Sequence, residues 1–181
     1  IPGLQSGASN GQVLTYNSTN GDIELADASG GGASAINDLS DAVTNSSGES
    51  IGLGTGALAN DDGSSNKNTA VGYQAANALT TGSISVAVGY QALKSITTGH
   101  SNVALGYQAM YDTGTGVSES IAIGRLAQRK STASGNISIG YFGHYSLTSG
   151  SSNIAIGNQA GYSQTTGNSN VCIGAAAFDA A

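Results

Sequence analysis

Asn153-Ile154-Ala155-Ile156-Gly157 is one of eight copies of a single five-residue pattern in this 181-residue chain. Each copy has Asn or Ser first, branched residues second and fourth, a small residue between them, and Gly last. The final glycines lie 16 to 18 positions apart, at Gly54, Gly72, Gly89, Gly106, Gly124, Gly140, Gly157 and Gly174. A near-constant period of this length predicts a solenoid with one short strand per coil.

The pattern predicts a strand because branched residues at alternate positions suit a pleated surface, and the glycine allows the positive φ of a corner. Between copies, the chain typically reads Tyr-Gln-Ala, an apolar residue and a polar turn such as Thr80-Thr81-Gly82. Every coil therefore has a second short segment and a second corner. Equivalent strands then stack as parallel neighbours at about 4.8 Å, which gives a rod of roughly 40 Å.

The first residue of each pattern predicts a polar ladder at one corner, with side chains that bond along the stack. The asparagines of this ladder are Asn68, Asn102, Asn136, Asn153 and Asn170. Serine takes the same place at Ser50, Ser85 and Ser120.

Each strand has two apolar faces, which is a strong constraint on its surroundings. Alternation puts Ile154 and Ile156 on one face and Ala155 on the other. One face therefore lines the coil, and the other meets a partner, most simply a second copy of the chain. We place the branched pair inside and the small residues between chains, while the opposite assignment stays open. The predicted contact between chains consists of Ala70, Ala87, Ala104, Ala122, Ser138, Ala155 and Cys172.

The sequence N-x-A-[IV]-G followed by [YN]-Q-A resembles the head repeat of trimeric autotransporter adhesins. It resembles even more the G-Y-Q-A repeats of tail-fibre and structural proteins of bacteriophages. The resemblance covers about residues 50–178. It implies an all-β fold, a left-handed parallel β-roll solenoid of about eight coils, with three identical chains side by side in a rigid extracellular stalk or head. Such rolls serve both as spacers and as receptor-binding surfaces, so the resemblance specifies architecture more than function.

The composition is typical of a fibrous exterior protein. Glycine at 28 of 181 residues and charged residues at 9% depart from an ordinary globular domain, and a single proline excludes collagen. The net charge of -6 argues against a nucleic-acid partner and a basic membrane-binding patch. No apolar run approaches the ~18 residues that span a bilayer, so we expect no membrane insertion. The start lacks Met and a signal peptide, and we expect a fragment or a processed product.

The residues before the repeats form two predicted units. Residues 1–32 predict a β-hairpin connector, because 13–16 and 23–26 flank a polar cluster that ends in Asn20-Gly21. Residues 33–49 predict a short helical linker, because Ile36, Leu39 and Val43 have helical spacing and Ser34 is available as a helix cap. The repeat domain then occupies 50–178.

The sequence contains little that indicates chemistry, and we expect neither an enzyme nor a cofactor or metal site. His100 and His144 lie in or near turns without metal-ligand spacing, so we expect both in solvent. The acidic loop 61–66 fits a solvated turn better than a calcium site, because it lacks the distal glutamate. Cys172, the single cysteine, reads as a buried substitute for alanine rather than a reactive thiol.

A column of tyrosines is the best candidate for a receptor-binding surface. Tyr73, Tyr90, Tyr107 and Tyr141 follow the corner glycine in four coils and are expected to stack, either as structure alone or as a strip for glycan or protein. Tyr111 and Tyr145 fall just outside this column.

Three functions remain open from the sequence. The first is a homotrimeric fibre module of a virion tail fibre or extracellular appendage, joined to adjacent modules and presenting or making host attachment. The second is a receptor- or glycan-binding adhesin head on a bacterial outer surface. The third is a subunit of a self-polymerising extracellular filament.

Overall fold

The computed structural model describes residues 12–16, 23–27, 42–44, 49–64 and 66–178. The chain divides into two compact units, Ile1–Ser40 and Asp41–Ala181. In the first unit, β1 (Gln12–Tyr16) and β2 (Ile23–Asp27) pair antiparallel, with Leu14 opposite Leu25. These strands lie where the sequence predicts the arms of a hairpin. The connecting residues 17–22 fall outside the described part, so the hairpin turn stays a prediction.

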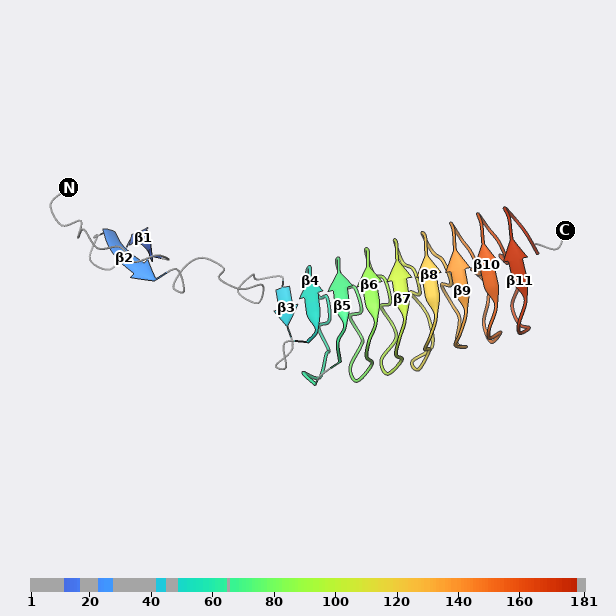
Figure 1. Ribbon diagram of the computed structural model, residues 1–181, viewed down its shortest axis with the longest axis horizontal. Coiled ribbons are helices and arrows are strands. Elements are labelled where there is room, and N and C mark those ends of the chain that lie inside the picture. The colour runs from blue at the N-terminus through green and yellow to red at the C-terminus, as the bar shows by residue number, and fades with distance from the viewer. Residues whose placement is uncertain (1–11, 17–22, 28–41, 45–48, 65, 179–181) are drawn as a thin grey trace. The chain divides into compact units, whose positions relative to one another are not determined.

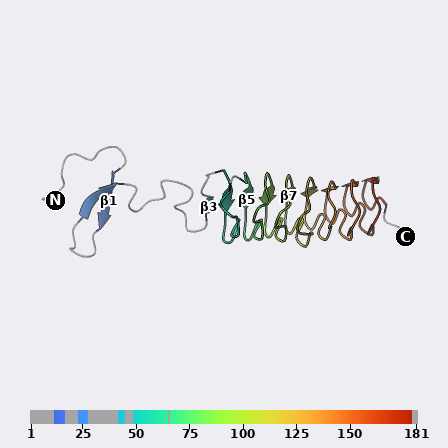
Figure 2. The same ribbon diagram turned by 90° about the horizontal axis from the view of Figure 1, so that it is seen from below.

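The second unit is a parallel β-solenoid, as the repeat predicts. Its strands are β4 (Ile51–Leu53), β5 (Thr69–Val71), β6 (Val86–Val88), β7 (Val103–Leu105), β8 (Ile121–Ile123), β9 (Ile137–Ile139), β10 (Ile154–Ile156) and β11 (Val171–Ile173). They lie in sequence order in one sheet, each parallel to the next (Figure 1). The coils that join them follow one another in a single row (Figure 2). Eight strands thus enclose about seven turns. The left-handed winding and the trimer stay predictions.

The corner glycines take the conformation that the sequence predicts. Gly72 has a φ of +128°, and Gly89 has a φ of +133°. A Cβ on Gly72 would lie 2.6 Å from the carbonyl oxygen of Gly89 in the next coil. Only glycine combines this conformation with so close an approach between coils.

The predicted corner ladder is confirmed and is continuous. Asn102 Oδ1 accepts a hydrogen bond from the backbone N–H of Ser120 at 3.1 Å, and Ser120 Oγ accepts one from the N–H of Asn136 at 3.3 Å. Asn102 Nδ2 also donates to the carbonyl of Val117 at 2.7 Å, which links the ladder to the turn that leads into the next strand. Because these groups are buried, the bonds satisfy backbone atoms that water cannot reach.

The assignment of the two strand faces is corrected by the structure. All seven small residues that we placed between chains are fully or almost fully buried within their own chain: Ala70, Ala87, Ala104, Ala122, Ser138, Ala155 and Cys172. The branched residues on either side of them point outward and are half-buried or exposed. The small residues therefore line the coil and cannot form a contact between chains.

The width of the coil explains this inversion. A Cβ added at Gly52, the small position of β4, would lie 3.0 Å from the carbonyl oxygen of Ala57 and 3.4 Å from its Cβ. The segment opposite the strand thus comes within van der Waals contact of the small position. A branched side chain pointing inward at this place would collide with backbone.

The predicted helical linker is wrong at its described end. Residues 42–44 form β3 (Ala42–Thr44), which pairs antiparallel with β4 and places Val43 opposite Gly52. Without β3, the backbone N–H and C=O groups along the free edge of β4 would be unpaired. Pairing with them outweighs the weak helical preference of residues 42–44. The described part of the chain contains no helix. The rest of the predicted helix, residues 33–41 and 45–48, lies outside the described residues.

Candidate interaction surfaces

The outward face of the sheet is the larger of two candidate surfaces. The parallel register aligns the branched residues into two rows, so that Val86 lies beside Val103 and Val88 beside Leu105. Val86 and Val88 are 36% and 38% exposed in the middle of the solenoid, and Val171 is 63% exposed in β11. We call these two rows, the first and third residues of β4–β11, the branched face. Except at Thr69, it presents apolar side chains to water along the full length of the described solenoid.

The second surface begins with the predicted tyrosine column, and the structure confirms the stacking for three of its four members. Tyr73, Tyr90 and Tyr107 are stacked, with ring centroids 5.4 and 5.3 Å apart and interplanar angles of 16° and 7°. All three are 44 to 46% exposed. Tyr141 is in line with them but is separated from Tyr107 by one coil.

Arg125 fills that gap in the column. It follows Gly124 as each tyrosine follows its own corner glycine. Its guanidinium carbon lies 5.7 Å from the ring centroid of Tyr107 and 5.3 Å from that of Tyr141. At this point, the column contains a cation between two aromatic ring faces, which attract it electrostatically.

A parallel column lies five residues after each corner glycine and was not predicted. It contains Lys94, Tyr111, Arg129, Tyr145 and Tyr162. Lys94 Nζ lies 5.3 Å from the Tyr111 centroid, and the guanidinium carbon of Arg129 lies 5.5 Å from Tyr111 and 5.8 Å from Tyr145. Tyr145 and Tyr162 stack at 5.4 Å. Tyr111 and Tyr145, which the sequence places outside the first column, thus belong to the second.

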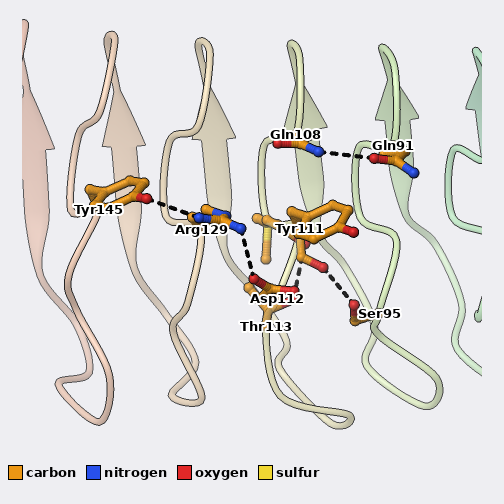
Figure 3. Close-up of polar contacts among 9 residues, drawn as sticks. Gln91, Ser95, Gln108, Tyr111, Asp112, Thr113, Arg129 and Tyr145 are labelled. Carbon is orange, nitrogen blue, oxygen red and sulfur yellow. Dashed lines mark hydrogen bonds and ion pairs between the residues drawn. The ribbon is translucent and has the colours of Figure 1, made fainter.

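Arg129 is the best-anchored cation of this surface. Its guanidinium donates to the Tyr145 hydroxyl at 2.9 Å and forms an ion pair with Asp112 at 3.2 Å (Figure 3). Ser95 donates to the backbone carbonyl of Tyr111 at 2.6 Å and so ties the second column to the coil below (Figure 3).

The two columns are joined through the residues that follow the first. Phe142 lies 4.0 Å from Tyr141 and 4.8 Å from Tyr145, measured between ring centroids. In the coils after β6 and β7, the position two residues after the corner glycine, which Phe142 occupies in its own coil, is a glutamine. Gln108 Nε2 donates a hydrogen bond to Gln91 Oε1 at 2.9 Å (Figure 3). We call the two columns together, with Phe142 and Lys130, the aromatic strip.

The aromatic strip presents hydroxyls and ring edges to solvent rather than ring faces. The faces of Tyr73, Tyr90 and Tyr107 are directed along the solenoid axis, because neighbouring rings stack on one another. Their hydroxyls form no hydrogen bond with the described residues, whereas the Tyr141 hydroxyl accepts one from Arg125 at 3.4 Å. Ring edges carry the positive end of the aromatic quadrupole.

One histidine, His144, lies inside the coil and not in solvent as predicted; His100 is exposed as predicted. His144 has the same offset from its corner glycine as the buried Leu93, which is the signal that the sequence reasoning missed. Its Nδ1 lies 2.9 Å from Ser138 Oγ. Burial lowers the pKa of His144 from 6.5 to about 4, against a smaller opposing contribution from Gln164. This Ser–His pair is sealed in the coil, and a substrate would have to open the coil to reach it.

Two other residues singled out in the sequence also have clear places. Cys172 is buried as predicted, and burial raises the pKa of its thiol. In the acidic loop, the Asp62 carboxylate accepts hydrogen bonds from Ser64 and Asn66, which lower its pKa. Within the described ranges, no group of three His, Cys, Asp or Glu side chains is placed to hold a metal ion.

Comparisons with protein-family models, with curated proteins and with solved structures give no match for this chain. In the part of the chain that the structure describes, no helix has the length and apolar character needed to cross a membrane.

Proposed function

We propose that this chain is a structural module of an extracellular fibre, a rigid homotrimeric rod that presents or makes host attachment in a viral tail fibre or a similar surface appendage. The branched face is the observation that carries the proposal. It extends over β4–β11 and remains in water when the chain is alone. Contiguous apolar surfaces of this kind on soluble proteins mark sites of association.

The resemblance to trimeric head and fibre repeats supports three chains as the number of copies. The burial of the small residues moves the proposed contact to the branched face, where each chain offers two rows of aliphatic side chains in parallel register. A closed ring of identical chains covers this face on every copy and leaves none open.

Rigidity is supported by the repetition of backbone contacts between coils. The Asn and Ser ladder and the close approach of the corner glycines recur along the whole solenoid. Each coil contacts its neighbours through the same groups, so the solenoid serves as a spacer between adjacent modules.

The alternative is an adhesin head on a bacterial surface, and the aromatic strip favours a binding role of this kind. Exposed tyrosines beside arginines are enriched among residues that dominate binding energy. A self-polymerising filament has less support, because the β4 edge that another copy would have to join is paired with β3.

A double substitution in the branched face tests the proposal. Val86→Asp/Val88→Asp places two charges per chain in the proposed contact, and we expect it to convert a trimer into monomers in analytical ultracentrifugation while the far-UV circular dichroism stays unchanged. Buried unpaired charges strongly oppose association. Thr98→Asp, in an exposed turn of the same coil, is the matched control and should remain trimeric. Equal masses for the two variants would refute the assigned contact.

A further inference from the structure

The basic residues of this chain are concentrated on the aromatic strip. The chain has five Lys and Arg against eleven Asp and Glu, and its net charge is -6. Four of the five basic residues, Lys94, Arg125, Arg129 and Lys130, lie on the strip. Eight of the eleven acidic residues precede residue 67, which leaves an excess of positive charge in 67–181. The overall acidity of the chain therefore conceals a local cationic surface.

Most of the positive charge of the strip has no carboxylate partner among the residues that the structure describes. Among the described residues, Arg129 pairs with Asp112, and the fifth basic residue, Lys67, pairs with Glu49. In the described part, tyrosine rings lie against the cationic groups of Lys94, Arg125 and Lys130, and none of these three groups forms an ion pair with a carboxylate. A cation between ring faces is held in a fixed place but keeps its capacity to bind an anion.

The groups beside these cations select the chemistry of the ligand. Because the tyrosine faces are stacked on one another, the strip cannot bind neutral sugars through ring stacking along its length. It offers instead phenol hydroxyls and positive ring edges about every 5.3 Å, with cations among them. Hydroxyls at a spacing close to one sugar unit suit an extended polysaccharide, and the cations require it to be acidic.

The distance between cations distinguishes a polysaccharide from a nucleic acid. Lys94 and Arg125 belong to coils two steps apart, which corresponds to about 10 Å along the axis. An acidic polysaccharide with one charge per disaccharide has charges at a comparable spacing. Each strand of double-helical DNA carries one phosphate about every 3.4 Å along the helix axis, and most of these charges would remain unpaired on this strip.

We propose that the aromatic strip binds an anionic polysaccharide with carboxylate or sulfate groups, with Arg125 and Lys94 pairing the anions and the tyrosine hydroxyls bonding the sugars between them. This inference rests on the attachment role in the proposed function, for which it names the ligand class.

Binding of the full chain to defined polymers tests the proposal. The probes are a carboxylated polysaccharide with one charge per disaccharide (hyaluronate), a sulfated one of similar charge spacing (keratan sulfate), neutral dextran and double-stranded DNA, each measured by biolayer interferometry at low and at physiological salt. We expect binding to at least one acidic polysaccharide, weakening with salt, and none to dextran. Binding to dextran as tight as to the acidic polymers, or tighter binding to the DNA, would overturn the proposal, as would no binding to either acidic polymer.

Substitutions distinguish binding at the aromatic strip from a non-specific attraction of the polymer to the basic residues of the chain. Lys94→Gln/Arg125→Gln should weaken binding by about tenfold or more, because two charge-assisted contacts are lost. Lys67→Gln removes the fifth basic residue, which lies outside the strip, and should change affinity much less. Tyr107→Phe removes one hydroxyl and should weaken binding by a few-fold. An equal loss with Lys67→Gln would contradict the assigned site.

The outcomes also separate this inference from the fibre proposal. A trimer that ignores both acidic polysaccharides refutes the inference and leaves the structural module intact. A monomer that binds them in an Arg125-dependent manner refutes the trimer and leaves the inference intact.

Discussion

The two halves of the solenoid, the lower half with the coils after β4–β7 and the upper half with the coils after β8–β10, have the same backbone and different interiors. In the coils that follow β4–β7, the interior is filled by apolar side chains, including Leu58, Leu79, Leu93, Ile96 and Met110. In the coils that follow β8–β10, three equivalent places hold the buried polar side chains of Gln128, His144 and Gln164, and Leu147 is the large apolar side chain fully buried beside them. Several of these polar atoms, both amide atoms of Gln128 among them, have no hydrogen-bond partner in the described residues.

This difference shows that the coil shape does not depend on an apolar filling alone. The corner glycines and the Asn and Ser ladder are present in both halves and fix the backbone of each coil on the one before. The filling then sets how stable each coil is. We therefore expect the two halves to respond differently to changes in their interiors.

The largest effect is expected from a carboxylate placed at the same small position in each half. Ala104→Asp buries an unpaired charge in the apolar half and should lower the free energy of unfolding by about 3–5 kcal/mol. Ser138→Asp puts the carboxylate beside Nδ1 of His144, where a protonated imidazole can pair with it, and should cost clearly less. Urea denaturation followed by circular dichroism measures both. Ala104→Ser is the uncharged control, and equal losses for the two Asp variants would contradict the difference between halves.

Lowering the pH should reduce the free energy of unfolding through one buried residue of the upper half, His144. The pKa of His144 falls from 6.5 to about 4 on folding, so the unfolded chain binds more protons between these values. The stabilisation is therefore complete above pH 6.5 and is lost as the pH falls to 4, by about 3 kcal/mol in total. Denaturation curves between roughly pH 7.5 and pH 4 measure this loss. The upper limit lies about one unit above the pKa of the unfolded state, and the lower limit equals the pKa of the folded state.

The two histidines provide the matched variants for that titration. His144→Gln should flatten the pH dependence of stability, whereas the exposed His100→Gln should leave it as in the unmodified chain. A pH profile that His100→Gln alone flattens would show that the buried imidazole is not the responsible group.

The smallest expected effect is a gain in stability in the upper half. Gln128→Met should stabilise the chain by about 1 kcal/mol, because it removes two unpaired amide atoms. The new side chain matches Met110, which occupies the equivalent place one coil below. Thermal unfolding measures the gain. Gln159→Met, at a half-buried outer position, is the control, and a loss of stability in Gln128→Met would mean that the polar interior is required.

The sequence predicts the strands, the corner glycines and the ladder because each depends on a local pattern that recurs with the period. It does not decide between the two strand faces, since both Ile154 and Ala155 are apolar and alternation alone treats them equally. The deciding quantity is the width of the coil, which depends on how closely residues such as Gly52 and Ala57 approach one another. This distance belongs to the folded chain.

The candidate binding surface was predictable in part. The tyrosines of the first column have a constant offset from the corner glycines, so their stacking follows from the period. Arg125 has the same offset, and Lys94 and Arg129 share another, but a search limited to aromatic residues does not find them. Their role becomes visible only when the coils are stacked and the distances to Tyr107 and Tyr111 are known.

The mass of the full chain in solution tests the central claim most directly, that the branched side chains point outward and are covered by identical partners. Light scattering coupled to gel filtration, over roughly a hundredfold range of concentration, should give three times the mass of one chain. This is the result expected when the protein concentration stays well above the dissociation constant of the trimer. A folded species with the mass of a single chain throughout that range would contradict the account.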